Sequence, residues 1–197
     1  MTRLVLASAS PARLTTLRAA GLDPEVIVSG VDESTVSTTD PASLALELAV
    51  LKARAVAGRV AGAIVVGCDS VLALDGAAHG KPATADEARA RWRSMRGRTG
   101  VLHTGHCVID DTGREHVRGA ATTVHFADVT DEEIDAYVGT GEPLQVAGAF
   151  TIDGLGGAFV QGIEGDHHNV VGISLPLLRE MLAAIDVPWT ALWPPTP

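Results

Sequence analysis

The order of apolar and amphipathic segments along the chain constrains its fold more than any other feature. Residues 4–7 form a short apolar run, and residues 63–74 form the most hydrophobic stretch of the sequence. Continuous runs of this kind are typical of buried strands, and segments with the apolar spacing of helices lie between them. Strands and helices therefore alternate, which indicates an α/β fold with residues 63–74 at the centre of the sheet.

The helix starts are marked by capping residues. Ser10 is expected to cap a helix that begins at Pro11, where the missing N–H of proline costs nothing. Residues 40–41, Asp-Pro, open a longer helix in the same way, and Thr84 and Thr130 are expected to cap two more. The buried stripe of the longer helix is predicted from its apolar spacing to consist of Leu44, Leu48, Leu51 and Ala55.

The second half of the chain changes from alternation to a hairpin. Strands are expected at residues 101–110 and 117–126, joined by a short turn, and a further strand near residues 158–163. A second strand near the start is expected at residues 25–29, and a last helix carries the apolar residues of 177–185. These elements together predict a mixed twisted sheet with flanking helices.

Size and composition indicate one domain. The chain has 197 residues, of which 46 % are hydrophobic and 20 % charged, which is ordinary globular usage. No apolar run approaches the ~20 residues of a membrane span, and the N-terminus lacks the pattern of a signal peptide. Cys68 and Cys107 lie inside apolar runs, so a reduced cytoplasmic protein is expected. We expect a domain over residues 1–185 and a Pro-rich tail over 186–197, of which residues 188–197 are expected to be mobile.

The charge balance excludes a large class of partners. Fifteen basic residues against twenty-four acidic ones give a net charge of −9, with no dense basic cluster. Binding to a nucleic-acid backbone requires a basic face, so this function is not expected. A small anion could still be bound where a few basic side chains converge. Only Lys52 and Lys81 are lysines, and all other basic residues are arginines, so both lysines are candidates for a role that arginine does not fill.

The first strand–helix junction has the features of an anion site. The hydroxyls of Ser8 and Ser10 precede a helix N-terminus, whose free N–H groups and positive dipole end favour a phosphate. Arg13 lies in the first turn, where a cation opposes the dipole unless an anion lies between them. The alternative is that Ser10 simply caps the helix. The sequence has no GxxxxGK[ST] pattern, so a P-loop is excluded.

A second set of candidates surrounds Asp69, a carboxylate near the end of the central strand. A buried carboxylate is costly unless it is paired or binds a metal, although it could also cap a turn. Glu33 could supply a second carboxylate for Mg²⁺, and Lys52 and Lys81 could reach the same cleft. Two carboxylates, two lysines and the phosphate cradle together suggest metal-assisted phosphoanhydride chemistry.

A transition-metal site built from histidines is the rival interpretation. His103 and His106 are three residues apart in a predicted strand and therefore face opposite sides of the sheet. The adjacent His167 and His168 also diverge if their segment is extended. Geometry therefore argues against this site, and the acidic run 131–133 is better explained by the helix dipole.

Seven segments resemble one known family in their order and spacing. They are SASPARLTTLRAAG, the VDES of residues 31–34, GCDSVLALDG, GKPATADEARA, MRGRTGVLHTG, YVGTGEPLQVAGAFTIDGLGG and NVVGISLPLL. From about residue 3 to residue 183 the chain resembles the Maf family of nucleotide pyrophosphatases. The resemblance implies a fold similar to that of the inosine triphosphate pyrophosphatases, with two lobes around a cleft.

The resemblance also implies an activity and a set of site residues. It implies hydrolysis of nucleoside triphosphates to monophosphate and pyrophosphate in the cytoplasm, with a divalent metal, Mg²⁺ or Mn²⁺, and a possible homodimer. The catalytic carboxylate, the proton acceptor of the family, falls on Asp69. The other polar positions of the family site fall on Ser8, Ser10, Arg13, Glu33, Lys52 and Lys81. The metal is expected at Asp69 and Glu33.

This sequence departs from the family at positions tied to base specificity. Ala12 replaces an arginine, Ser70 a threonine, Asp153 a glutamine and Phe150 a tyrosine. An amide both donates and accepts hydrogen bonds, whereas an ionised carboxylate only accepts. Substrates that offer a donor, such as guanine or cytosine, are therefore expected to gain relative to thymine. Modified nucleotides remain candidate substrates.

A different class of function is the alternative: a nucleotide-sensing or partner-binding regulator of cell division, to which the family name is linked. A regulator could keep the phosphate cradle and lose the catalytic carboxylate. Asp69 and both lysines are present, and this favours the enzyme.

Overall fold

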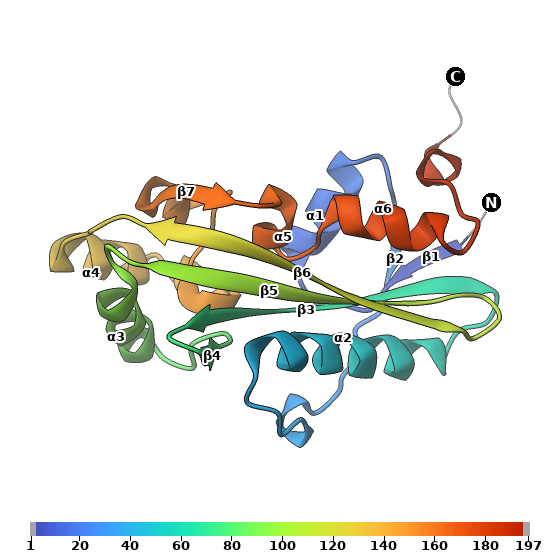
Figure 1. Ribbon diagram of the computed structural model, residues 1–197, viewed down its shortest axis with the longest axis horizontal. Coiled ribbons are helices and arrows are strands. Elements are labelled where there is room, and N and C mark those ends of the chain that lie inside the picture. Colours follow the sequence, from blue (N-terminus) through green and yellow to red (C-terminus); the bar gives the residue numbers. More distant parts are fainter. Residues whose placement is uncertain (1–2, 195–197) are drawn as a thin grey trace.

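The computed structural model describes residues 3–194 and has a single mixed sheet with helices on both faces (Figure 1). The strands are β1 (Arg3–Leu6), β2 (Glu25–Val26), β3 (Ala63–Leu74), β4 (Ala77–His79), β5 (Thr99–Ile109), β6 (Glu115–Phe126) and β7 (Val160–Glu164). The helices are α1 (Pro11–Ala19), α2 (Pro41–Ala57), α3 (Ala85–Met95), α4 (Asp131–Gly139), α5 (His167–Val171) and α6 (Leu175–Ala183). The predicted α/β class is confirmed.

The order of strands in the sheet is β2-β1-β3-β5-β6-β7, and β4 pairs with the far end of β3. The strand β1 pairs with its two neighbours in parallel, whereas β3, β5, β6 and β7 are antiparallel. The long strand β3 is central, as its apolar run predicts.

One edge of β3 is interrupted, and this interruption positions the site. Pairing with β1 ends at Leu6 opposite Val66, and pairing with β4 begins at Leu72 opposite His79. Between these points, residues 67–71 have no strand on that side within the described part of the chain. A ligand can therefore approach the backbone and side chains of a strand that is otherwise buried.

Helix α2 lies closer to the sheet than expected, and its predicted stripe is wrong. Its buried face consists of Pro41, Ala45, Leu48, Ala49, Ala53 and Val56, so only Leu48 of the predicted stripe is buried. The reason lies in β3 and β5, where Gly67 and Gly105 face the helix. A Cβ at Gly105 would overlap the carbonyl of Ala45, and one at Gly67 would overlap that of Ala49. Where the helix crosses these two glycines, its buried residues are alanines: Ala45, Ala49 and Ala53.

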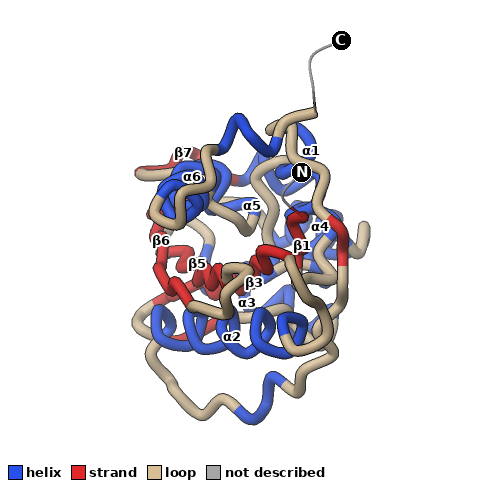
Figure 2. Tube along the Cα trace, turned by 90° about the vertical axis from the view of Figure 1, so that its right-hand side faces the viewer, coloured by secondary structure: helices blue, strands red, loops and turns tan. Residues whose placement is uncertain are grey.

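Three apolar clusters divide the molecule into two lobes. Around the N-terminal strands, one cluster lies between the sheet and helices α1 and α6, and another lies under α2. Figure 2 shows these helices on opposite faces of the sheet. The third cluster forms the other lobe, where Trp92 of α3 packs edge-to-face on Phe126, Tyr137 and Phe159.

The strand β2 is shorter than expected. It ends at Val26 rather than continuing to Ser29, and the carbonyls of Val28 and Ser29 instead accept from the Arg59 side chain. The short strand β4 was not predicted at all, since its three residues have no apolar pattern.

The C-terminal segment contacts the domain, contrary to the expectation of a mobile tail. Residues Trp189–Leu192 form a 3₁₀ turn, and the indole of Trp193 donates to the carbonyl of Ala20 at 3.1 Å. Trp189 and Leu192 pack on the cluster beside α1 and α6. Residues 195–197 lie outside the described part of the chain. None of the helices in the described residues combines the length and the apolar character needed to cross a bilayer.

Candidate active site

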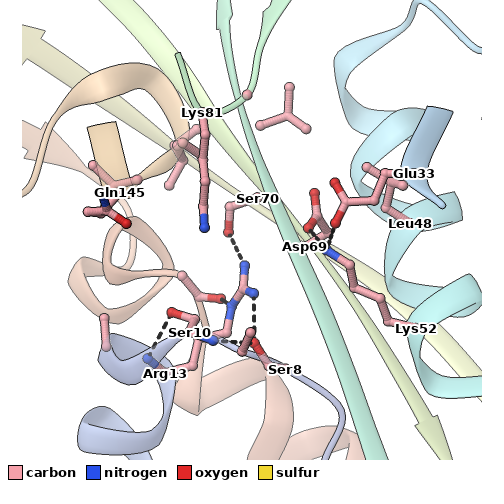
Figure 3. A pocket seen from close by; sticks show the side chains of 18 of the residues that line it. Ser8, Ser10, Arg13, Glu33, Leu48, Lys52, Asp69, Ser70, Lys81 and Gln145 are labelled. Atoms are coloured by element: carbon pink, nitrogen blue, oxygen red, sulfur yellow. Dashed lines mark hydrogen bonds and ion pairs between the residues drawn. The ribbon is translucent and has the colours of Figure 1, made fainter. Parts of the chain in front are cut away.

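A cavity of about 680 Å³ lies along the interrupted edge of β3. It is bounded by the β1–α1 junction, the 28–38 loop, helix α2 and the segment after α4. The ten candidate residues predicted from the sequence come from distant parts of the chain and all line this cavity: Ser8, Ser10, Ala12, Arg13, Glu33, Lys52, Asp69, Ser70, Lys81 and Asp153. Figure 3 labels all of them except Ala12 and Asp153.

The β1–α1 junction builds the cradle at one end of the cavity. The Ser10 hydroxyl caps α1 by accepting from the Arg13 N–H at 3.4 Å. The Ser10 N–H in turn donates to the Ser8 hydroxyl at 3.1 Å, so the two serines fix each other. The N-terminus of α1, with its positive dipole end, therefore opens onto the cavity.

Arg13 is a buried cation with no carboxylate partner. Its side chain is held from three directions: Nε donates to the Gly172 carbonyl at 2.7 Å, Nη1 to Ser8 Oγ at 3.2 Å and Nη2 to Ser70 Oγ at 3.1 Å. The residue is only 8 % exposed, and no ion pair neutralises it among residues 3–194. Burying an unpaired charge is costly. The structure thus holds a positive charge at the place where an anionic ligand would neutralise it.

On the opposite face of β3, Lys52 joins the two carboxylates. Its ammonium lies 2.5 Å from Asp69 Oδ1 and 2.7 Å from Glu33 Oε1. The side chains of Lys52 and Asp69 are only 12 % and 13 % exposed, whereas that of Glu33 is half-exposed. Because Asp69 and Ser70 are adjacent in a strand, their side chains point to opposite faces. Asp69 therefore meets α2, and Ser70 meets Arg13 of α1.

Lys81 approaches the cavity from the segment after β4. The neighbouring Gly80 carbonyl accepts from Arg91 Nη1 at 2.5 Å and from the Gly148 N–H at 3.1 Å, which fixes the backbone beside the lysine. In Figure 3 the Lys81 side chain extends toward Ser70 and the Arg13 guanidinium. The cavity thus has cationic groups on several sides.

Another part of the cavity wall is formed by the segment that carries Asp153. Gln145, Phe150, Thr151 and Asp153 line it. The residue that holds this segment, Glu142, was not predicted from the sequence. The carboxylate of Glu142 accepts from Thr151 Oγ1 at 2.5 Å, from the Tyr137 hydroxyl at 2.8 Å and from the N–H groups of Leu155 and Gly156. The Gly-Glu-Pro sequence at 141–143 was the available signal, but it lies outside the cavity.

The histidines take other places. His106 is a fully buried residue of β5, while His167 and His168 lie in the short helix α5 rather than in an extended segment. Within the described residues no three His, Cys, Asp or Glu side chains gather as a ready-made metal site. The acidic run at 131–133 opens α4, where Thr130 and Glu133 form the expected cap.

The fold and the cavity together define a class of protein. It is an α/β protein with a cleft at a broken sheet edge, lined by a buried arginine, two lysines and a pair of carboxylates. Residues 3–185 match the family described as Maf-like protein. The chain belongs to this family, as its sequence motifs indicate.

Two relatives with high sequence identity to this chain have the same functional name. A protein of Streptomyces avermitilis is 60 % identical over 98 % of this chain and 95 % of its own length, and one of Streptomyces coelicolor is 61 % identical with the same coverage. Both are named nucleoside triphosphate pyrophosphatase. Among solved structures, a HAM1 protein from Coxiella burnetii superposes with a TM-score of 0.51 at 17 % identity. The match covers 95 % of this chain and 100 % of that one, which shows a shared fold.

Proposed function

We propose that this protein is a nucleoside triphosphate pyrophosphatase that hydrolyses its substrate to a nucleoside monophosphate and pyrophosphate. The names of its relatives support the reaction class. The observation that carries the proposal is the buried Arg13, which has no carboxylate partner in the described chain and faces the same cavity as Asp69. A triphosphate supplies the missing negative charge, and the carboxylate supplies a base.

The phosphate chain binds at the α1 end of the cavity in this proposal. Ser8, Ser10 and the free N–H groups of the helix donate hydrogen bonds. The guanidinium has five N–H donors, and three are engaged with Gly172, Ser8 and Ser70. The remaining two are available for phosphate oxygens, and the engaged ones hold the group in its orientation. Lys81 adds a mobile charge where oxygens of the transferred group become more negative.

Asp69 accepts a proton from the attacking water. Lys52 binds its Oδ1 atom, while Oδ2 has no hydrogen-bond partner among residues 3–194 and is free to bind the water. The water oxygen attacks the α-phosphorus, the bond from that phosphorus to the bridging oxygen breaks, and pyrophosphate leaves with the bond electrons. The lysine keeps the carboxylate oriented before the attack.

A divalent cation fits the donor set. Mg²⁺ is commonly held by one or two carboxylates together with substrate phosphates, and Asp69 and Glu33 are two hard oxygen donors that already enclose a cation, the ammonium of Lys52. These two residues would hold Mg²⁺ or Mn²⁺. The metal would neutralise charge on the phosphates, as it does in other phosphoryl transfers.

The base lies at the end of the cavity that contains Asp153. Asp153 is exposed and lines the cavity, and its carboxylate only accepts hydrogen bonds. This supports a preference for bases that present an exocyclic amino donor, guanine or cytosine, over thymine, which has no amino group. We propose that modified nucleotides with such donors are also substrates.

The decisive experiment measures pyrophosphate and orthophosphate release from a panel of normal and modified nucleoside triphosphates with Mg²⁺, Mn²⁺ or EDTA. Asp69→Asn should lower turnover by about 10²–10⁴-fold, the usual contribution of a general base. Asp111→Asn, in an exposed turn outside the cavity, is the matched control and should keep the full rate. Orthophosphate alone would place cleavage at the terminal phosphate. Tight nucleotide binding without any turnover would contradict the enzyme and favour the regulator.

A further inference from the structure

A buried threonine stands behind the cavity and is connected to Arg13. Thr104 of β5 is fully buried and lies directly opposite Ser70 of β3 in the sheet. The two hydroxyl oxygens are 2.9 Å apart, and Thr104 Oγ1 is 3.2 Å from the carbonyl oxygen of Asn169. Thr104 itself does not line the cavity. It can therefore act on a ligand only through Ser70.

The partners determine the direction of each hydrogen bond in this chain. The carbonyl of Asn169 can only accept, so the single proton of Thr104 is donated to it. Thr104 Oγ1 then accepts the proton of Ser70, which lies 2.9 Å away. Ser70 Oγ therefore has no proton to give to Arg13 and only accepts from it. Arg13 Nη2 donates to Ser70 Oγ at 3.1 Å. The Ser70 proton thus points into the sheet, away from the cavity.

Helix α5 anchors the far end of the same chain. The side-chain amide of Asn169 donates to the Leu102 carbonyl and to Thr122 Oγ1, each at 3.1 Å, and so ties α5 to β5 and β6. The Gly172 carbonyl that follows α5 accepts from Arg13 Nε. The sheet and α5 therefore hold the guanidinium from two sides.

We propose that Thr104 is a positioning residue for Arg13, and that Ser70 acts on the phosphate end of the ligand through Arg13 rather than on the base. The proposal rests on the proposed function, because it takes Arg13 to bind the phosphates. It gives Ser70 a different role from the one that the family resemblance implies. Ser70 Oγ has its proton committed to Thr104 and accepts from Arg13, so it has no donor left for a base.

Thr104→Val tests this directly because valine keeps the shape and removes the hydroxyl. The Ser70 proton is then free to turn toward Arg13, and the guanidinium loses a fixed acceptor. Pyrophosphate, which has no base, is the probe, and its affinity is measured by calorimetry. We expect Thr104→Val to bind pyrophosphate about tenfold more weakly, the effect of one charge-assisted hydrogen bond. Thr104→Ser, which restores the hydroxyl, should bind within about twofold of the wild type.

Two further measurements separate positioning from a general structural effect. The ranking of bases by kcat/KM should stay unchanged in Thr104→Val, and the double variant with Ser70→Ala should bind pyrophosphate no more weakly than Ser70→Ala alone. If Thr104→Val does not fold, Ser70→Ala carries the test with the same expected loss of pyrophosphate affinity. An unchanged affinity, or a changed base ranking, overturns the proposal. Because calorimetry needs no turnover, a wild type that binds pyrophosphate but hydrolyses nothing would refute only the proposed function.

Discussion

His106 makes the stability of this protein depend on pH in a way that can be worked out from its contacts. The imidazole is fully buried. Nδ1 lies 3.1 Å from the Thr104 carbonyl, which can only accept, and Nε2 lies 2.9 Å from the Ser174 N–H, which can only donate. The ring is therefore neutral with its proton on Nδ1. Protonation would place a second N–H against the N–H of Ser174 at the start of α6.

Burial, followed by the nearby positive charge of Arg13, lowers the pKa of His106 to about 4 from an ordinary value of 6.5. The unfolded chain therefore binds a proton at a higher pH than the folded chain. Stability is complete above pH 6.5 and falls as the pH drops toward 4. One unit of pKa corresponds to about 1.4 kcal/mol, so the loss over this interval is about 3 kcal/mol.

The assay is urea unfolding of the wild type and of His106→Gln between pH 7 and pH 4. The variant loses packing and is less stable at pH 7, but it cannot take up the proton. We expect its unfolding free energy to fall about 3 kcal/mol less than that of the wild type over the interval. The comparison removes the contributions of His79 and His103, whose pKa values are also lowered, mainly by burial. Parallel pH profiles of the two proteins would refute this reasoning.

Three other substitutions test different parts of the structure. Gly105→Ala places a methyl group against the Ala45 carbonyl and should lower the unfolding free energy by about 3 kcal/mol, measured with urea. In Glu142, Oε1 accepts from two hydroxyls and the Gly156 N–H, and Oε2 accepts from the Leu155 N–H. Glu142→Gln replaces one of these oxygens with an NH₂ group, so it should cost about 1–3 kcal/mol in thermal unfolding and raise KM by loosening the segment of Asp153. Asp153→Gln should shift kcat/KM from guanine and cytosine toward thymine, because an amide also donates.

A specific result would contradict each of these three predictions. Gly162→Ala, at a position with open space around it, is the control for Gly105→Ala, and equal stability of the two variants would contradict the close approach of α2. A Glu142→Gln variant with unchanged KM and stability would mean that the segment of Asp153 keeps its position without Glu142. An unchanged substrate ranking in Asp153→Gln would exclude this residue from base selection.

The elements of the fold were predictable where their signals are local. Capping residues fix the starts of α1 and α2, and the long apolar run fixes β3. The buried face of α2 was not predictable in this way. It depends on Gly67 and Gly105 in two other strands, which let the helix approach so closely that alanines replace leucines on its inner face. The docking of Trp193 on Ala20 is likewise a contact between distant parts of the chain.

In the candidate site, too, contacts between distant parts of the chain were not predictable from the sequence. Residue type and motif resemblance singled out Arg13, Asp69 and both lysines, and the fold brings them to one cavity. Thr104 and Glu142 were not predicted, because neither lines the cavity and each acts through hydrogen bonds to other residues. Thr104 and Ser70 are 34 residues apart. The sequence of one strand does not indicate which residue of the neighbouring strand lies opposite a given hydroxyl.

The broken edge of β3 explains why these residues can act on one ligand. Adjacent strand residues point to opposite faces of a sheet, and Asp69 and Ser70 accordingly belong to two separate clusters, one with Lys52 and one with Arg13. In a fully paired strand the neighbouring strand would separate the two faces. Because β1 ends at Leu6 and β4 begins only opposite Leu72, the cavity is open to both. In the proposed function, a single ligand therefore binds through its phosphates on one face while the carboxylate of the other face reaches its reacting atom.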